Sequence, residues 1–302
     1  MRECIIIGAG IAGLTAALYA QRKRMDFLLI SEDFGGQLNL SGEIENYPGI
    51  VKTDGQEFEK VLKEQMDYNK VEMKEEKVTG IENSGNNFRV KTEKSDYKAR
   101  SVIIASGARA RKLNVPGEKE FANKGLTYCA ICDGPLFPDK EVAIIGGGNA
   151  AFEAADFMLN IAKRIHLIDA ADQPIAHEYL QERIKDHDKV EYINKAKVKE
   201  IYGDKMAGGI RYEREGKEHK LDVGGVIIEI GRIPNTEPFK GLVEINDSGH
   251  IIIGCDTKTS QEGIFAAGDC ASGEEYQYVI AAGQGCMALL KAARYLAGKK
   301  EG

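Results

Sequence analysis

Two glycine-rich segments of the same kind, 138 residues apart from Gly8 to Gly146, constrain the fold of this chain more than any other feature. The first reads Gly-Ala-Gly-Ile-Ala-Gly over residues 8–13, and the second reads Gly-Gly-Gly-Asn-Ala-Ala over 146–151. Each follows a short, mostly apolar run, at 4–7 or 141–145, and each precedes a segment of helical composition. A strand, a glycine turn and a helix in this order form the context in which such a segment binds a dinucleotide. The repeat therefore predicts an α/β fold with two Rossmann-like domains.

The three glycines of the first segment have separate expected roles. Gly8 allows the tight turn, Gly10 lets a pyrophosphate approach the backbone, and Gly13 lets the helix over 14–21 pack closely on the strand. Free amides at the start of that helix would face the phosphates. The predicted contacts are Gly8, Gly10, Ile11, Ala12 and Gly13.

An acidic residue follows the next predicted strand, as in other dinucleotide-binding units. Residues 27–30 are apolar and end at Ser31-Glu32. A carboxylate at this place can accept a hydrogen bond from the adenosine ribose. Glu32 is the predicted ribose ligand.

A pair of cysteines separated by two residues precedes the second glycine segment. Cys129 and Cys132 can close a small disulfide ring, and nearby dipoles can lower the pKa of one thiol, so the pair suits thiol-disulfide exchange. Asp133 adds a carboxylate that can give or take a proton. Zinc ligation is an alternative, but it needs about four ligands, and the five histidines are scattered from His166 to His250. Inert buried thiols are another alternative, and we interpret the pair as a redox dithiol.

The composition excludes several classes of protein. A chain of 302 residues with 43% hydrophobic content can bury one large core or two moderate ones. A net charge of −6 without a lysine-rich block argues against nucleic acid as the principal partner. No apolar run approaches the ~20 residues of a membrane span, and a strand pattern begins at once, which leaves no room for a signal peptide. Six cysteines are too few for a secreted disulfide scaffold, so a cytoplasmic location is predicted.

Two turn-rich segments follow the first glycine segment. They read Gly-Gly-Gln-Leu over 35–38 and Glu-Asn-Tyr-Pro-Gly over 45–49. Together with the residues at 8–13, in this order and spacing, they resemble the flavin domain of low-molecular-weight thioredoxin reductases. Surface loops are the alternative interpretation. The resemblance implies that FAD binds at the first glycine segment, with contacts from Gly36, Gln37, Leu38 and Asn46.

Later segments extend this resemblance over nearly the whole chain. The predicted strand 102–105 ends in Ser106-Gly107, where the family usually has Thr-Gly. Another strand, from residue 263, ends in the family's second FAD motif, whose Asp269 would accept from a ribityl hydroxyl; a surface turn is the alternative. Tyr-Gln-Tyr at 276–278 stands where the family commonly has Tyr-Arg-Gln, before the predicted last helix. The implied FAD contacts here are Gly107, Gly268, Asp269, Tyr278 and Val279.

The resemblance also implies that the second domain is inserted into the first. Residues 109–116 lack clear periodicity, as expected where a chain crosses between domains, and the chain is expected to return near residue 240. The predicted FAD-binding domain therefore comprises 1–113 and 240–302. Residues 114–239 would form a redox-dithiol domain of the pyridine-nucleotide-binding type.

The sequence departs from the family at the expected nicotinamide-nucleotide site. The family pattern for NADPH is a strand followed by His-Arg-Arg and a further Arg, whereas residues 169–176 here read Asp-Ala-Ala-Asp-Gln-Pro-Ile-Ala. Asp169 would accept from a free ribose hydroxyl and repel a 2′-phosphate, since two like charges about 4 Å apart cost on the order of 1 kcal/mol even in water. NADPH is therefore not the expected donor. The intact glycine loop permits NADH, or it only packs the helix against the strand.

The resemblance implies a flavoprotein disulfide reductase that reduces thioredoxin and, as in its family, forms a homodimer. By family analogy Cys132 faces the flavin, Cys129 attacks the partner and Asp133 manages the proton. Because the nicotinamide-phosphate cations are missing, the chain looks most like the ferredoxin-dependent flavin thioredoxin reductases, which implies ferredoxin as the donor. The alternatives are an NADH-dependent reductase of a thioredoxin or peroxiredoxin system, and a non-catalytic redox-sensing flavoprotein.

Overall fold

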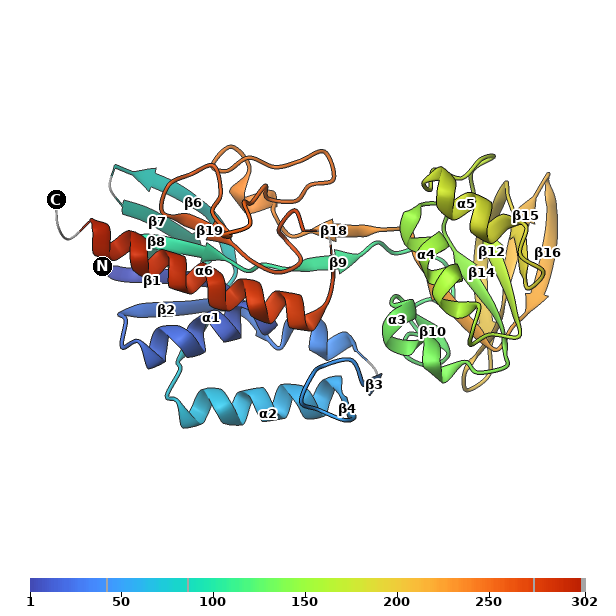
Figure 1. The fold of residues 1–302 in the computed structure, drawn as a ribbon, viewed down its shortest axis with the longest axis horizontal. Helices are drawn as coiled ribbons and strands as arrows, with labels where there is room; N and C mark the ends of the chain where they lie inside the picture. Colours follow the sequence, from blue (N-terminus) through green and yellow to red (C-terminus); the bar gives the residue numbers. More distant parts are fainter. Residues whose placement is uncertain (42, 86, 274, 300–302) are drawn as a thin grey trace. The chain divides into compact units, whose positions relative to one another are not determined.

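The computed structural model describes every residue except 42, 86, 274 and 300–302, and it divides into two compact units (Figure 1). The first unit comprises 1–41, 47–109 and 233–302, and the second comprises 42–46 and 110–232. The second unit is thus inserted into the first, as the sequence predicts. The chain changes units at 109/110 and at 232/233, whereas the crossings are predicted near residues 113 and 240.

The first unit is built on a seven-stranded sheet with the order β5-β2-β1-β8-β7-β6, in which β19 pairs with β8. The pairs β1/β2, β1/β8, β2/β5 and β8/β19 are parallel, and β6, β7 and β8 form antiparallel pairs. The central strand β1 is apolar because sheet neighbours and helices bury it on all sides. The bounds are β1 Arg2–Ala9, β2 Phe27–Phe34, β5 Met73–Glu75, β6 Val78–Ser84, β7 Asn87–Thr92, β8 Asp96–Ile104 and β19 Ile264–Ala266.

Helices cover this sheet, and α1 packs against α6 (Figure 1). Asp54 begins α2 by accepting a hydrogen bond from the Glu57 amide at 2.8 Å, which satisfies an amide that has no partner within the helix. No helix in the described part of the chain is both long and apolar enough to cross a membrane. The bounds are α1 Ile11–Arg22, α2 Gly55–Tyr68, α6 Tyr278–Gly298, and the short helices η1 Gly36–Leu40 and η3 Glu237–Phe239; the strands β3 Glu43–Ile44 and β4 Thr53–Asp54 have two residues each.

The second unit contains a five-stranded parallel sheet with the order β10-β17-β11-β12-β13. A separate antiparallel sheet with the order β14-β15-β16 forms a meander. The bounds are β10 Leu126–Thr127, α3 Ala130–Asp133, η2 Gly134–Leu136, β11 Glu141–Ile145, α4 Asn149–Met158, β12 Arg164–Ile168, α5 Glu178–Lys185, β13 Val190–Ile193, β14 Ala196–Gly203, β15 Ala207–Arg214, β16 Lys217–Asp222 and β17 Gly225–Ile228.

Two short strands lie where the chain changes units. They are β9 (Ala108–Ala110) and β18 (Arg232–Pro234), and they pair with each other. The sequence instead predicts an irregular crossing at 109–116. The pairing of two segments far apart in the sequence supplies the backbone hydrogen bonds that neither could form alone.

Two glycines of α6 provide a matched test of its packing on α1. A Cβ atom added at Gly285 would lie 2.0 Å from the carbonyl oxygen of Ala12, whereas one added at Gly283 would have no atom within 4 Å. We expect Gly285→Ala to lower the free energy of unfolding by about 1–3 kcal/mol because the helices must move apart. Gly283→Ala should raise it by about 0.5–1 kcal/mol, since alanine loses less backbone entropy in an exposed helix. Urea unfolding midpoints check both values, and equal effects of the two variants would contradict this packing.

Candidate functional site

A crevice of about 260 Å³ opens at the carboxyl ends of the parallel strands in the first unit. Because β1, β8 and β19 run parallel, the segments that follow them meet at one edge of the sheet. These segments are the first glycine segment, residues 105–108 and residues 267–269. The predicted cofactor residues that line the crevice are Gly8, Gly10, Ile11, Ala12, Gly36, Gln37, Gly107, Gly268, Asp269 and Tyr278.

The three glycines of the first glycine segment occupy positions of three different kinds. Gly8 has φ +102°, and a Cβ there would lie 2.2 Å from the carbonyl oxygen of Ala105. A Cβ at Gly13 would lie 1.7 Å from the carbonyl oxygen of Gly8, so this glycine brings helix and turn together outside the crevice lining. Gly10 has no atom within 4 Å of its Cβ position. The open side of Gly10 leaves the room that a diphosphate needs to approach the backbone.

The acidic residue of β2 that lines the crevice is Asp33, and the predicted Glu32 is not among the lining residues. Strand β2 continues to Phe34, and because side chains alternate along a strand, Asp33 and Glu32 point to opposite sides. Glu32 forms an exposed ion pair with Lys77 at 3.4 Å. Burial and then the charge of Glu32 raise the pKa of Asp33. Strand β2 thus continues beyond the predicted end at residue 30, and the contact of Glu32 with the ribose stays a prediction.

Three further predicted contacts lie outside the crevice lining. Leu38 is fully buried, Asn46 is exposed in the segment grouped with the second unit, and Val279 is 46% exposed. Neighbouring polar groups hold other residues in place: Gln37 donates from Nε2 to the carbonyl oxygen of Ala108 at 2.8 Å, and the hydroxyls of Ser41 and Tyr278 are hydrogen-bonded.

Asn235 lines the same crevice, although the sequence pattern does not indicate it. Its Nδ2 donates to the carbonyl oxygen of Ser106 at 2.9 Å, and its own carbonyl oxygen accepts from the Ser106 hydroxyl at 2.8 Å. Arg109 donates to Asn235 Oδ1 and also to Glu237 at 3.1 Å. The sequence gives no local signal for this role, because these partners lie more than a hundred residues away.

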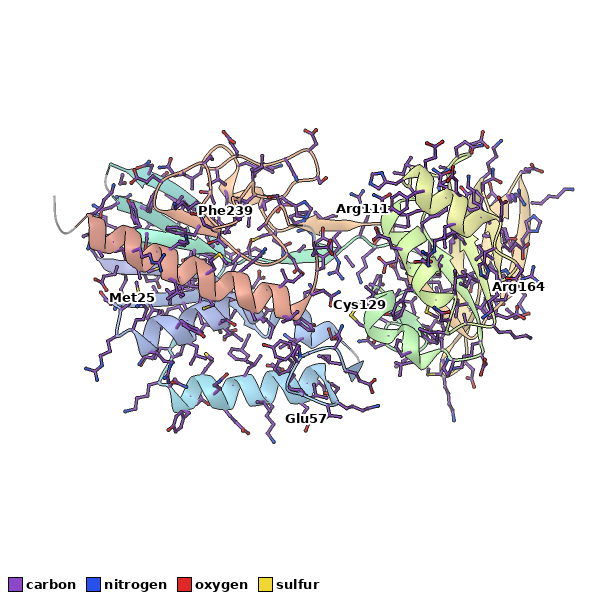
Figure 2. The ribbon with its side chains drawn as sticks, viewed as in Figure 1. Met25, Glu57, Arg111, Cys129, Arg164 and Phe239 are labelled. Carbon is purple, nitrogen blue, oxygen red and sulfur yellow. A yellow bond between two sulfur atoms is a disulfide. The ribbon has the colours of Figure 1, made fainter. Side chains whose placement is uncertain are left out.

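The dithiol of the second unit is a disulfide between Cys129 and Cys132 at the start of α3 (Figure 2). Cys129 is the N-cap residue, and its Sγ accepts a hydrogen bond from the Cys132 amide at 3.2 Å. Its own amide donates to the hydroxyl oxygen of Thr127 at 3.1 Å. Both cysteines are half-buried. Backbone and side-chain hydrogen bonds thus hold the sulfur atoms in a short turn.

Asp133 is buried at the end of this turn. The Thr127 hydroxyl donates a hydrogen bond to Oδ2 of Asp133, and the Asp133 amide donates to the carbonyl oxygen of Cys129 at 3.1 Å. Thr127 bonds to both Cys129 and Asp133, a role that the sequence pattern does not indicate. The hydroxyl fixes the direction of the carboxyl group beside the dithiol.

Polar and charged residues around Tyr128 hold the segment that precedes the dithiol. The buried Glu118 accepts hydrogen bonds from the amides of Leu113 and Asn114 at 3.0 and 2.6 Å and from the Tyr128 hydroxyl at 3.0 Å. The Lys112 ammonium lies 3.5 Å from the centre of the Tyr128 ring. Burial raises the pKa of Tyr128 and lowers that of Lys112. The residue before Cys129 is therefore held at both its ring and its hydroxyl.

Asp169 lies against the second glycine segment with both carboxylate oxygens engaged. Oδ1 accepts from the Ala171 amide and Oδ2 accepts from the Tyr192 hydroxyl, each at 2.9 Å. The side chain is 6% exposed, and a Cβ added at Gly147 would lie 1.8 Å from Oδ2. The Ile175 amide also donates to the Gly147 carbonyl oxygen at 2.9 Å. The loop after β12 is therefore folded back onto the glycine segment.

The zinc interpretation finds no ligand set in the residues that the structure describes. Among them, no group of three or more His, Cys, Asp or Glu side chains could hold a metal ion. His166 contacts Glu191 at 3.1 Å and Glu141 at 3.3 Å, on neighbouring strands. These contacts give the buried His166 a structural role between neighbouring strands.

The chain is similar to known proteins over nearly its whole length. A family model described as pyridine nucleotide-disulphide oxidoreductase matches residues 2–285. An alkyl hydroperoxide reductase component of Staphylococcus aureus (strain MSSA476) is 38% identical over 298 residues, which cover 97% of this chain and 59% of that protein. The chain therefore spans less than two thirds of this curated relative.

Two solved structures share the fold over nearly their whole length. The thioredoxin reductase of Streptococcus pyogenes MGAS5005 is 37% identical, with a TM-score of 0.93 and 99% coverage of both chains. A ferredoxin-flavin thioredoxin reductase of Clostridium acetobutylicum is 32% identical, with a TM-score of 0.57, and the match covers 100% of this chain and 99% of that one. The cofactor is FAD, which the open glycine crevice fits. The chain belongs to the pyridine nucleotide-disulphide oxidoreductase family.

Proposed function

We propose that this protein is an FAD-dependent disulfide reductase that reduces thioredoxin through Cys129 and Cys132, with reduced ferredoxin as the electron donor. The observation that carries the proposal is the Cys129–Cys132 disulfide, which lies in a hydrogen-bonded turn beside the buried carboxyl group of Asp133. A half-buried pair in such a turn is open to a partner's sulfur and is also able to close again.

The dithiol reduces its partner in two successive thiol-disulfide exchanges. The Cys129 thiolate attacks one sulfur of the partner disulfide, a mixed disulfide forms, and the other partner sulfur leaves as a thiolate. Cys132 then attacks Cys129 Sγ, which releases the reduced partner and restores the Cys129–Cys132 bond. Asp133 takes the Cys132 proton and passes it to the leaving partner sulfur. Bound FAD supplies the one-electron and two-electron chemistry that recharges the dithiol.

The donor assignment is supported by the groups around Asp169. Ala170 and Ala171 stand where cations would meet a 2′-phosphate, and Asp169 brings a negative charge. Both of its oxygens already accept a hydrogen bond within the unit, and the residue is only 6% exposed, so little of the carboxylate is open to a ribose hydroxyl. The likeness to a ferredoxin-flavin thioredoxin reductase supports the same assignment.

An NADH-dependent reductase of a peroxiredoxin system is the second candidate. The 38% identity with the alkyl hydroperoxide reductase component favours it, as does an acid at position 169, which suits a free ribose hydroxyl. NADH would need the buried Asp169 side chain to become accessible to its ribose hydroxyl. A non-catalytic redox-sensing flavoprotein is a further alternative, which thioredoxin turnover would exclude.

The homodimer is also part of the proposal, and an apolar face of α6 supports it. Ile280, Met287 and Leu290 are each more than a third exposed, and their spacing of seven and three residues places them on one side of the helix. Burial of this face between two copies would remove apolar surface from water. We propose a cytoplasmic location for this dimer, on the sparse cysteine content of the chain.

Replacement of either cysteine tests the dithiol. We expect Cys129→Ser and Cys132→Ser each to abolish thioredoxin reduction while FAD stays bound, because neither residue lines the flavin crevice. Cys255→Ser, at an exposed cysteine without a disulfide partner, is the matched control and should keep full activity. Turnover assays and the flavin absorbance spectrum check both statements. Substantial activity in Cys129→Ser or Cys132→Ser would refute electron transfer through this dithiol.

Asp133→Asn tests the proton step. The amide keeps the size of the side chain but cannot carry the proton, so turnover should fall by about a hundredfold with an unchanged flavin spectrum. Asp139→Asn, at an exposed aspartate nearby, is the control. Steady-state rates from acid to alkaline pH provide the measurement, and a parent-like rate at every pH would remove Asp133 from the mechanism.

An anaerobic reduction experiment tests the donor. The oxidised protein is mixed separately with NADPH, NADH and chemically reduced ferredoxin, and flavin absorbance is followed. NADPH should leave the flavin oxidised because Asp169 and the missing cations disfavour its 2′-phosphate. NADH should reduce the flavin only slightly because the Asp169 carboxylate is buried within its own unit. Reduced ferredoxin should bleach the flavin and sustain thioredoxin turnover. Dithionite provides the control for a reducible flavin, and rapid bleaching by micromolar NADPH would overturn the assignment.

A further inference from the structure

A second carboxyl group reaches the dithiol turn from the central sheet. Glu229 follows β17, and its amide donates to the carbonyl oxygen of Ile145 at 2.8 Å, which fixes its backbone to the neighbouring strand. Its Oε1 accepts a hydrogen bond at 3.3 Å from the amide of Ala130, the residue directly after Cys129. In the sequence, Glu229 looks like an ordinary residue in an apolar strand. The fold brings its carboxyl group to the segment between the two cysteines.

The surroundings of Glu229 leave its charge poorly compensated. Burial raises the pKa of Glu229 to about 7, while the Ala130 amide and the charge of Arg232 lower it and the charge of Glu153 raises it. Arg232 comes from β18 and Glu153 from α4, and the Asp133 carboxyl of α3 is bonded to Thr127. The ionisation of Glu229 therefore falls near neutral pH.

We propose that Glu229 is a positioning residue of the dithiol, whose carboxyl group holds the turn at Ala130 and whose charge sets the pH at which the reduced Cys129–Cys132 pair forms its thiolate. The inference rests on the proposed function in that it takes this pair as the catalytic dithiol. A negative carboxylate close to a thiol disfavours the thiolate and raises the thiol pKa. The neutral carboxyl group keeps the hydrogen bond from Ala130 without this repulsion.

The direction of the effect follows from the two ionisations. Above about pH 7 Glu229 is charged, so a thiolate must form beside a like charge; well below it, Glu229 is neutral and the repulsion disappears. Loss of the carboxylate should therefore ease thiolate formation at neutral and alkaline pH and change little in acid. A merely structural role would alter stability or turnover without this pH signature.

Thiol alkylation measures the effect directly. Full-length protein is reduced with dithiothreitol, freed of reductant without air, and treated with iodoacetamide from about pH 5.5 to 10, a range that spans the ordinary thiol pKa, with Cys129 and Cys132 peptides quantified by mass spectrometry. The midpoint in Glu229→Gln should lie about one pH unit below that of the parent, with convergence in the acid range. The pH midpoint is compared between the proteins and the maximal alkylation rate is not, because a thiolate with a lower pKa is also a weaker nucleophile.

Two further variants separate charge from shape. Glu229→Asp keeps the carboxylate and should return the midpoint most of the way to the parent value. Glu153→Gln removes a nearby charge without touching the Ala130 hydrogen bond and should leave the midpoint unchanged. Superimposable profiles for the parent and Glu229→Gln would overturn the proposal.

A measurement on the parent protein keeps the proposal testable if Glu229→Gln does not fold. Because coupling between two sites is reciprocal, the thiolate should raise the pKa of Glu229. Ionisation of Glu229 should in turn slow thiolate formation, so the alkylation rate of the parent should rise by clearly less than tenfold per pH unit across the range near pH 7 where Glu229 ionises. A uniform tenfold rise per pH unit up to the midpoint would equally overturn the proposal. Neither measurement uses ferredoxin, thioredoxin or turnover, so failure of the proposed function would appear separately, as full activity in the cysteine variants.

Discussion

Both units depend on a close backbone contact where the first strand turns into its helix. In the first unit, a Cβ at Gly13 would lie 1.7 Å from the carbonyl oxygen of Gly8. In the second, a Cβ at Gly146 would lie 2.2 Å from the carbonyl oxygen of Glu229, so the turn also packs against the backbone that follows the neighbouring strand β17. Side chains at these glycines would separate helix and sheet. The contacts bring polar groups from distant segments to one edge of each sheet.

The local part of this design could be predicted from the sequence. Buried parallel strands have continuous apolar runs, so the predicted strand at 141–145 matches β11 and the one at 4–7 lies within β1. The glycine turns carry their own signature, and the spacing of Cys129 and Cys132 already permits a disulfide ring. These features depend on residues that are close in the sequence, which is why pattern and spacing are sufficient for them.

The rest of the site depends on contacts between residues that are distant in the sequence. Glu32 and Asp33 differ only in which side of β2 they occupy, and the extension of the strand to Phe34 decides that question. Asn235 and Glu229 each follow an unremarkable segment, and their partners Ser106 and Ala130 lie about a hundred residues away or more. No periodicity records such pairs, because they arise only when the sheet is assembled.

The acidic groups of the second unit differ in what they can do because their partners differ. Asp169 accepts two hydrogen bonds from groups of its own unit, so its charge is held in place as part of the loop structure. Asp133 is bonded to Thr127, which also bonds the Cys129 amide, so this carboxyl group is oriented together with the dithiol. Glu229 contacts the same turn from a different strand. Two carboxyl groups that belong to separate elements and meet at one turn can be adjusted independently. The proton transfer and the thiolate pKa of the dithiol can therefore be set by different residues.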